Sequence, residues 1–196
     1  MTGGAPPGGG VTGAAPSGEG MAGSAPPGEG APGGAPSGAG AGLRIRPARP
    51  DEAAALSALA LRSKAHWGYD AAFLERCRDE LTLRPADLLS RHAAVAELGG
   101  RVVGFVTIEG EPPEGEIGAL FVEPDLIGSG SGAGRALFAH AAAVARSAGF
   151  ACLLIDADPG AEGFYLRLGA RRVGEAPSGS VPGRMLPRLA YEIVAT

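Results

Sequence analysis

A ladder of alternate glycines is the feature of this sequence best suited to chemistry. It follows an apolar run at 117–122 and has four members: Gly128, Gly130, Gly132 and Gly134. Glycines let backbone N–H groups approach an anion closely, and a helix that begins at such a loop adds the positive end of its dipole. The pattern therefore predicts an anion site at residues 129–135, with phosphate as the first candidate.

The residue types in the loop narrow the choice of phosphate ligand. It lacks the Gly-Lys-Ser/Thr of a Walker A loop. Residues 128–133 match the dinucleotide pattern G-x-G-x-x-G/A formally, and Asp156 follows at the end of the next strand. A dinucleotide fold needs further strand–helix units, however, and only 40 residues remain after Asp156. Nicotinamide binding is therefore the least favoured interpretation.

The elements around the glycines form a strand, loop, helix, strand unit. The helix ends at Gly149, and its apolar face consists of Leu137, Phe138, Ala141, Val144, Ala145 and Ala148. The next strand, 151–156, contains the apolar run Cys152–Ile155, which is typical of a strand buried on both faces.

The rest of the chain alternates short strands and helices. Apolar periodicity, caps and turns predict a strand at 43–46, helices capped by Asp51 and Asp70, a hairpin of 93–98 and 102–108, one short helix after Asp156, a loop at 177–187 and a last strand at 189–194. Cys77 falls on the apolar stripe of the second helix, so we expect it in the core.

The strand–loop–helix unit resembles the central motif of the GCN5-related N-acetyltransferase superfamily. In that family a strand ending in Val-x-Pro leads to Arg/Gln-x-x-Gly-x-Gly/Ala, which opens a helix and binds the pyrophosphate of acetyl-CoA through backbone amides. This sequence reads Leu120-Phe121-Val122-Glu-Pro124, then Ser129-Gly130-Ser131-Gly132-Ala133-Gly134, then Arg135. Together with a second motif, its order, spacing and context carry the resemblance over roughly 43–196.

The second motif of the family places a Tyr on a short helix after the next strand, and here residues 156–170 supply it as Phe164-Tyr165. The sequence departs from the family at Ser129, where Arg or Gln is usual, and at Gly160, where Asn is frequent. The loop after Pro124 is also longer than the common spacing, and an alignment that starts at Ile127 shifts the motif glycines to Gly130 and Gly132.

The resemblance implies an α/β (α+β) acyl-CoA N-acyltransferase fold. We expect a mixed, mostly antiparallel sheet of six to seven strands, helices on both faces, and a central parallel pair, 117–122 and 151–156, that splays apart. It also implies acetyl-CoA as co-substrate and no metal. The cofactor would lie between the splayed strands and contact two sets of residues: Leu120, Phe121 and Val122 at the pantetheine, and Ser129, Gly130, Ser131, Gly132, Ala133, Gly134 and Arg135 at the pyrophosphate.

The resemblance also implies the catalytic groups. Tyr165 would protonate the departing thiolate of CoA, although an amphipathic helix residue with a wet hydroxyl fits the same pattern. The backbone N–H near Val122 would polarise the thioester carbonyl. An amine must be neutral to attack, so a base acts directly or through water. Glu116 is the first candidate, with Glu109 and Glu111 as rivals, and each could equally be a solvated charge at a strand end.

The acceptor wall of the family usually follows the first helix. His66 and Trp67 would line a pocket for a primary amine of a small molecule, and Arg184, in the loop 177–187, would bind an acidic group. The alternative places Trp67 in the core, Lys64 in solvent and the loop as a plain connection.

Composition bounds the remaining function classes. Residues 1–42 form an imperfect ten-residue repeat of Gly, Pro and Ala with too few large apolar residues for a core. We expect them to be disordered, which leaves 43–196 as one N-acetyltransferase domain. The net charge of −4 comes without a basic block, so no nucleic-acid partner is expected.

The same composition argues against a membrane partner and a secreted protein. No apolar run approaches the roughly 20 residues of a membrane span, and no secretory signal is visible. Cys77 and Cys152 form neither a metal motif nor a disulfide framework, which fits a reduced cytoplasm. The sequence leaves open whether the protein forms a homodimer. Two functions remain: an acetyl-CoA-dependent N-acetyltransferase, and a non-catalytic acyl-CoA-binding or sensing module on the same fold.

Overall fold

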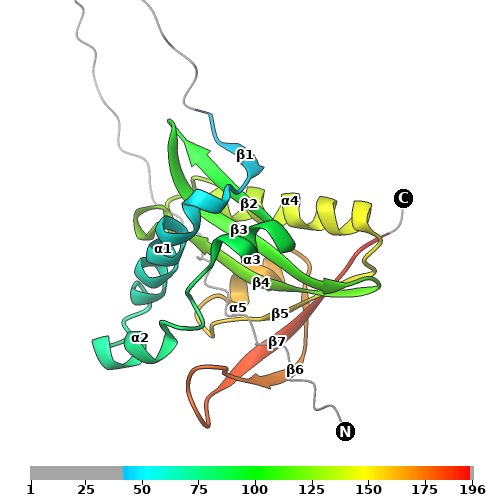
Figure 1. Cartoon of the computed structure of the whole chain (residues 1–196). Helices are drawn as coiled ribbons and strands as arrows, with labels where there is room; N and C mark the ends of the chain where they lie inside the picture. Colours follow the sequence, from blue (N-terminus) through cyan, green and yellow to red (C-terminus); the bar gives the residue numbers. More distant parts are fainter. Residues whose placement is uncertain (1–41, 195–196) are drawn as a thin grey trace, which may run out of the picture.

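The computed structural model describes residues 42–194 (Figure 1). Apart from Gly42, the predicted repeat tail lies outside the described residues. The strands are β1 (Arg44–Pro47), β2 (His92–Leu98), β3 (Arg101–Glu111), β4 (Glu114–Val122), β5 (Cys152–Asp156), β6 (Arg171–Pro177) and β7 (Met185–Glu192). The helices are α1 (Ala53–Ala65), α2 (Ala71–Cys77), α3 (Pro85–Ser90), α4 (Ala133–Ala148) and α5 (Glu162–Arg167), with 3-10 turns η1 (Pro50–Glu52) and η2 (Pro124–Leu126).

One sheet organises the fold, with the strand order β1-β2-β3-β4-β5-β7-β6. Every neighbouring pair is antiparallel except β4 and β5, which are parallel. Their pairing covers only Glu114–Glu116 against Cys152–Leu154, and beyond these residues the strands separate. The predicted mostly antiparallel sheet with a splayed parallel pair is confirmed.

The separation begins at a bulge in β4. Ile108 pairs with Ile117 and Thr107 with Ala119, so Gly118 is an extra residue in the ladder. The carboxylate of Glu109 lies against it, because a Cβ at Gly118 would be 1.9 Å from Glu109 Oε1. Glycine therefore lets a carboxylate pack onto the strand where β4 leaves β5.

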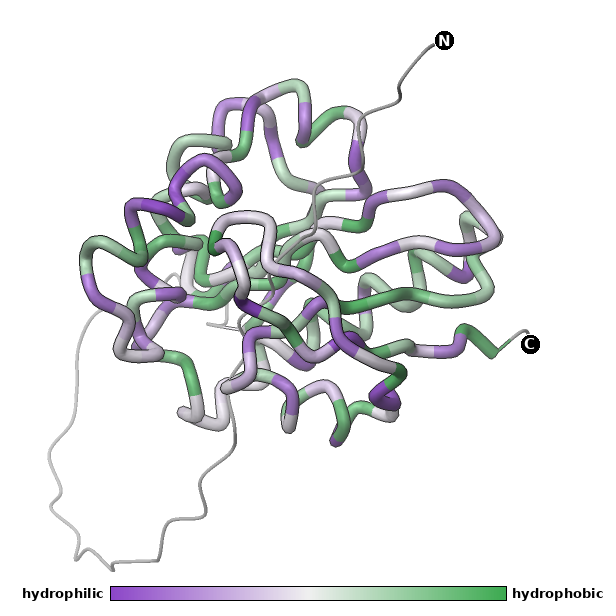
Figure 2. The backbone as a smooth tube through the Cα atoms, turned by 90° about the horizontal axis from the view of Figure 1, so that it is seen from below, coloured by the Kyte–Doolittle hydropathy of each residue, from purple (hydrophilic) through white to green (hydrophobic). Residues whose placement is uncertain are grey.

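Two apolar cores lie on opposite faces of the sheet. Helices α1 and α3 cover one face, and α4 and α5 cover the other (Figure 1). Strand β4 contributes side chains to both cores. Ile117 and Leu120 pack towards α4, whereas Ala119 and Phe121 pack towards α1. Hydrophobic stretches run through the middle of the fold, and many hydrophilic ones lie towards its outside (Figure 2). Within residues 42–194, no helix has both the length and the apolar character needed to cross a membrane.

Several local predictions need correction. Helix α3 and strand β6 were not predicted, and β7 begins at Met185, inside the segment expected to be a loop. Asp51 lies in η1 and does not cap α1, whose N-cap is Glu52 without a side-chain bond. Asp70 does cap α2, because its carboxylate accepts a hydrogen bond from the Phe73 N–H at 2.7 Å. Cys152 is only partly buried, so β5 is not covered on both faces along its whole length.

Candidate active site

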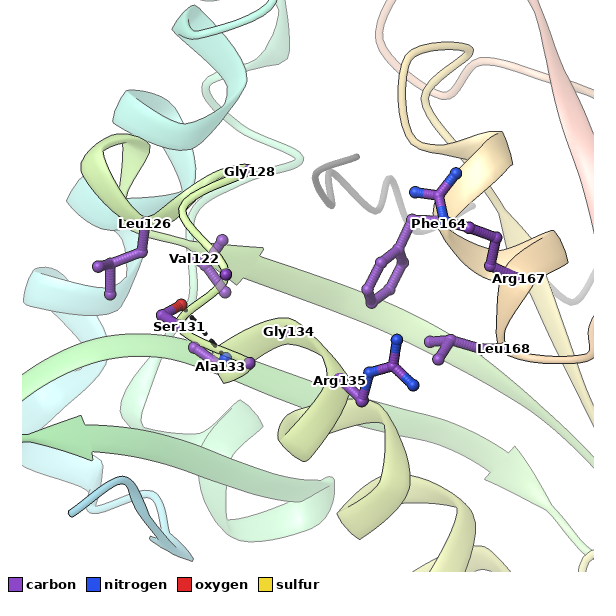
Figure 3. Close-up of a pocket in the computed structure, with 12 residues that line it drawn as sticks. Val122, Leu126, Gly128, Ser131, Ala133, Gly134, Arg135, Phe164, Arg167 and Leu168 are labelled. Atoms are coloured by element: carbon purple, nitrogen blue, oxygen red, sulfur yellow. Dashed lines mark hydrogen bonds between the residues drawn. The ribbon is translucent and has the colours of Figure 1, made fainter. Parts of the chain in front are cut away.

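The glycine loop forms a cradle at the start of α4. Gly128, Gly130 and Gly132 have φ values of 72°, 77° and 75°, which only glycine adopts readily. The first hydrogen bond of the helix runs from Ala136 N–H to the Gly132 carbonyl, and the Ala133 N–H donates to the Ser131 hydroxyl at 3.4 Å, so the N–H groups of Gly134 and Arg135 precede the helical ladder. They open onto a pocket of about 170 Å³, whose size and donors suit a pyrophosphate (Figure 3).

Local bonds hold the lengthened loop in shape. Part of the extra length is taken up by η2, directly after Pro124. The Ser129 hydroxyl donates to the Leu126 carbonyl at 2.9 Å and accepts from the Ser131 N–H at 3.3 Å. Ser129, which replaces the usual Arg or Gln, therefore braces the loop from within and does not line the pocket.

The pocket contains most of the predicted cofactor residues. It is lined by Val122, Leu126, Gly128, Gly130, Ser131, Gly132, Ala133, Gly134, Arg135, Phe164, Arg167 and Leu168. Leu120 and Phe121 are buried in the two cores, so only their backbone could meet a cofactor. Arg167 and Phe164, which sequence reasoning missed as pocket residues, face the glycine loop from α5, and Arg135 faces it from α4 (Figure 3). Two arginines beside the cradle favour a polyanionic ligand.

Tyr165 lies next to this pocket but inside the core. Its side chain is 0% exposed, and its ring packs against Phe138 and Phe164 with centroids 5.8 Å and 5.0 Å away. Phe164, the residue before it on α5, lines the pocket. The α5 helix therefore presents Phe164 to the cradle and Tyr165 to the interior.

The candidate bases lie where β4 is still paired with β5, just before the two strands separate. Glu109 and Glu116 face each other across β3 and β4 at neighbouring positions, on the α1 side of the sheet. Glu109 pairs with Arg91 at 3.0 Å, and burial raises the pKa of its carboxyl despite that partner. Glu116 lies within the field of Arg188, whose pKa it helps to raise. Glu111 is exposed at the turn between the strands.

The two predicted acceptor residues differ in placement. His66 is exposed at the end of α1. Trp67 lies on the β5–α5 connection, because a Cβ at Gly160 would be 2.5 Å from the indole ring. The departure from the usual Asn at this position therefore has a physical reason: any side chain at Gly160 would overlap Trp67. Trp67 follows α1 and packs, partly buried, against the core near the carboxyl end of β5.

A set of polar and charged residues lies together near Trp67, with Lys64 and Asp158 buried and the others half-buried, and we call it the ionic cluster. Its members are Lys64, Tyr69, Glu80, Asp158 and Arg184. The Oδ2 atom of Asp158 accepts from Lys64 Nζ at 3.3 Å, from the Tyr69 hydroxyl at 2.9 Å and from Arg184 Nη2 at 3.3 Å. Its Oδ1 atom accepts from the Gly160 N–H at 3.1 Å.

Aromatic rings hold the cations of the ionic cluster. The Arg184 guanidinium stacks on the rings of Tyr69 and Phe73, 5.0 Å from each centroid, and also donates to the Tyr69 hydroxyl. Burial and the nearby Asp158 charge raise the pKa of Tyr69 to about 12, so its hydroxyl stays a donor at neutral pH. Lys64, expected in solvent under the alternative interpretation, is 1% exposed.

Comparison with known proteins identifies the family to which this chain belongs. The sequence model of the Acetyltransferase (GNAT) family matches residues 58–170, which is more than half of the chain. The chain belongs to the GNAT acetyltransferase family. A search of curated protein sequences found no match for this GNAT protein.

Solved GNAT structures share its fold. A GCN5-related N-acetyltransferase from Rhodopseudomonas palustris superposes with a TM-score of 0.65 at 24% identity, covering 77% of this chain and 96% of its own. PaiA N-acetyltransferase from Thermoplasma acidophilum, in complex with coenzyme A, gives 0.62 at 16% identity, covering 76% and 98%. The YncA protein from Salmonella typhimurium, with its cofactor acetyl-CoA, gives 0.55 at 20% identity, covering 79% and 95%.

Sequence reasoning missed four members of the ionic cluster in this GNAT protein: Lys64, Tyr69, Glu80 and Asp158. One signal was available. Lys64 follows Leu56 and Ala60 at helical spacing, so it falls on the buried stripe of α1, where a lysine needs a partner. Its partner, Asp158, is 94 residues away, and no local pattern connects the two.

Proposed function

We propose that this GNAT protein transfers an acetyl group from acetyl-CoA to a primary amine of a small molecule. The observation that carries the proposal is the glycine cradle, which opens beside a parallel strand pair that separates after Glu116. Pyrophosphate would bind the N–H groups of residues 130–135, and Arg135 and Arg167 would add charge. Pantetheine would follow the unpaired backbone of Leu120–Val122 between the strands.

In the proposed mechanism, groups of the protein supply the base, the oxyanion donor and the acid of the transfer. Acetyl-CoA supplies the activated acyl carbon. Glu116, with Glu109 as its rival, accepts the proton of the amine directly or through water. The backbone N–H near Val122 polarises the carbonyl, and Tyr165 donates its proton to the leaving thiolate. Trp67 and His66 would line the acceptor path, with Arg184 at its inner end.

One observation favours a second function, a non-catalytic acyl-CoA-binding or sensing module. Tyr165 is fully buried, and Phe164 occupies the pocket wall in its place. A chain of this kind would bind acetyl-CoA without turning it over with any amine.

Ligand titration followed by turnover tests the proposal. Thermal unfolding of the full chain is measured with acetyl-CoA, CoA and NADH added separately, and a ligand at about 100 times its Kd should add about 2.7 kcal/mol of stability. We expect shifts with both CoA species and none with NADH. Acetyl-CoA consumption is then followed with a panel of primary amines. Binding without turnover would favour the sensing module, and no shift with either CoA species would contradict both functions.

A further inference from the structure

A second cavity, of about 340 Å³, lies between α4 and the end of the short strand β1. It has twice the volume of the glycine cradle and shares no lining residue with it. Its size falls within the roughly 300–1,000 Å³ that is typical of small-molecule sites. The groups of the proposed acetyl transfer all lie elsewhere, so that reaction does not account for this cavity.

The sequence opens this cavity by ending β1 early and by placing small side chains around the space. Pro47 is the last residue of β1 and pairs with Ala94, so the start of β2 extends beyond the β1 ladder. Leu88, Val106 and Ile108 form an apolar floor, and each is at most 5% exposed. Burial of a hydrocarbon chain against such a floor is favourable. Alanines complete the lining, namely Ala48, Ala93, Ala94 and Ala141.

The ionisable residues that line the cavity are an arginine and two histidines, Arg91, His92 and His140. Within the part of the chain that the structure describes, no Asp or Glu lines it. An imidazole can donate a hydrogen bond through a ring N–H, and a guanidinium has five donors and no acceptor. The Nη1 atom of Arg91 pairs with Glu109 Oε1 at 3.0 Å, from outside the lining, and this holds the guanidinium in place. The cavity therefore favours a ligand whose polar end accepts hydrogen bonds and carries negative charge.

The two histidines lie at the mouth of the cavity. Both also line a neighbouring hollow of about 420 Å³ along α4, together with Ser147 and Ala148. His92 is exposed and His140 is half-buried, so solvent reaches both side chains, whereas the apolar floor is buried. A ligand would consequently place its charged end at the histidines and its hydrocarbon on the floor.

We propose that this cavity binds a small apolar monocarboxylic acid. Its carboxylate accepts hydrogen bonds from His92 and His140, Arg91 adds positive charge, and its hydrocarbon chain packs on the apolar floor. The glycine cradle lies at the first turn of α4, whereas the cavity borders later turns of the same helix. The acid and acetyl-CoA should therefore bind at the same time.

Octanoate is the probe for this site, with octanol and octylamine as controls of the same chain length. Binding to the full chain is measured by calorimetric titration and by thermal unfolding, with and without saturating CoA. Octanoate should bind about 10- to 100-fold more tightly than octanol, the range of one hydrogen bond to a charged group. Its thermal shift should add to that of CoA.

Three results would overturn the proposal. They are equally tight binding of octanol or octylamine, no binding of octanoate, and a shift with octanoate that CoA abolishes, which would place the acid in the cofactor site. The comparison of octanoate with octanol needs no bound CoA, so it decides the matter even if the chain fails to bind CoA and the proposed function is wrong.

Filling the cavity locates the binding site. Val144→Phe places a ring in the cavity and should abolish octanoate binding. Ala139→Phe adds the same ring at an exposed position of α4 outside both hollows, and it should leave binding unchanged. Should Val144→Phe lose its circular dichroism, Val144→Leu adds less volume and should weaken binding in part. Unchanged octanoate binding in a folded variant with a larger side chain at Val144 contradicts the inference.

Two further variants test the carboxylate contacts. His140→Ala and Arg91→Gln should each bring the affinities for octanoate and octanol closer together. Arg101→Gln is the matched control for Arg91→Gln, because it removes an ion pair of the same length, 3.0 Å, far from the cavity lining. If both His140→Ala and Arg91→Gln fold and keep the wild-type preference for octanoate, the assigned contacts are wrong and the proposal fails.

Discussion

The carboxylate oxygens of Glu80 are buried and accept no hydrogen bond from residues 42–194, so ionisation of this side chain opposes folding. Burial raises the pKa of its carboxyl, and the charges of Lys64 and Arg184 offset this only in part. The folded chain therefore binds the proton more tightly than the unfolded chain. The contribution of Glu80 to stability is most favourable below the unfolded pKa, about 4.3, and is lost as the pH rises through the higher folded value.

Replacing Glu80 should accordingly stabilise the chain at neutral pH. We expect Glu80→Gln to raise the free energy of unfolding at pH 7–8, and the gain should shrink as the pH falls towards about 4. Urea denaturation across that range measures it. Glu75→Gln is the control, because Glu75 is exposed and Arg78 lowers the pKa of its carboxyl. Equal gains for both variants would mean that surface charge, and not burial of Glu80, is responsible.

Tyr165 carries the proposed acid role from a fully buried position. Tyr165→Phe removes only the hydroxyl, so acetyl-CoA binding should be unchanged while kcat falls about 100-fold, the scale of general acid catalysis. Steady-state turnover and ligand-induced thermal shifts measure the two effects. Tyr191→Phe is the matched control, because the Tyr191 ring also packs on Phe138, at 4.9 Å. An unchanged kcat in Tyr165→Phe would remove the residue from the mechanism.

At the scale of elements, the loop before α4 combines backbone conformation with ligand contact. Gly132 is the N-cap of the helix with φ 75°, and a Cβ there would meet no neighbour. Gly132→Ala should therefore cost about 1 kcal/mol of stability through the left-handed backbone alone, and should also weaken acetyl-CoA binding because the cradle N–H groups move. Gly100→Ala, in the β2–β3 turn at φ 80° and equally open, should cost similar stability and leave binding unchanged. Chemical denaturation and calorimetric titration separate the two effects, and equal binding losses would argue against a pyrophosphate site at Gly132.

The elements that could be predicted are those with a periodic apolar pattern. Strand β4 was found as an apolar run between turns, and helix α4 because its apolar residues recur at helical spacing. Helix α3 has six residues and one buried side chain, Leu88, too few to show a period. Strand β6 lies at the edge of the sheet with only Ala176 buried, so its sequence has no alternation. Its pairing with β7 is a tertiary effect that local sequence does not carry.

The candidate site divides in the same way. The cradle was predictable, because its residues are nearly contiguous and glycine spacing reflects the backbone directly. The ionic cluster was not, because its five residues come one each from α1, the α1–α2 loop, the α2–α3 connection, the β5–α5 connection and the β6–β7 loop. Arg184 alone was singled out, from its place in a Pro/Gly-rich segment, and its partners Tyr69 and Asp158 became visible only in the fold.

On the scale of the whole molecule, a single sheet joins the two apolar cores, so the cores should unfold together. Leu59 belongs to the α1 core and Leu137 to the α4 core, and their side chains are 2% and 0% exposed. Leu59→Ala and Leu137→Ala should each cost about 2–5 kcal/mol. Because β4 contributes side chains to both cores, each variant should still unfold in one transition.

Two probes can test this cooperativity within the same chain. Trp67 is the only tryptophan, and its fluorescence reports the contact between α1 and the β5–α5 connection, whereas far-ultraviolet circular dichroism reports all helices and strands. Coincident curves for wild type and both variants are expected. If Leu59→Ala shifted the fluorescence transition and left the dichroism transition in place, the α1 layer would be an independent unit. The ionic cluster, whose residues come from both sides of that boundary, would then form only when the layer docks, and acceptor recognition would depend on that docking.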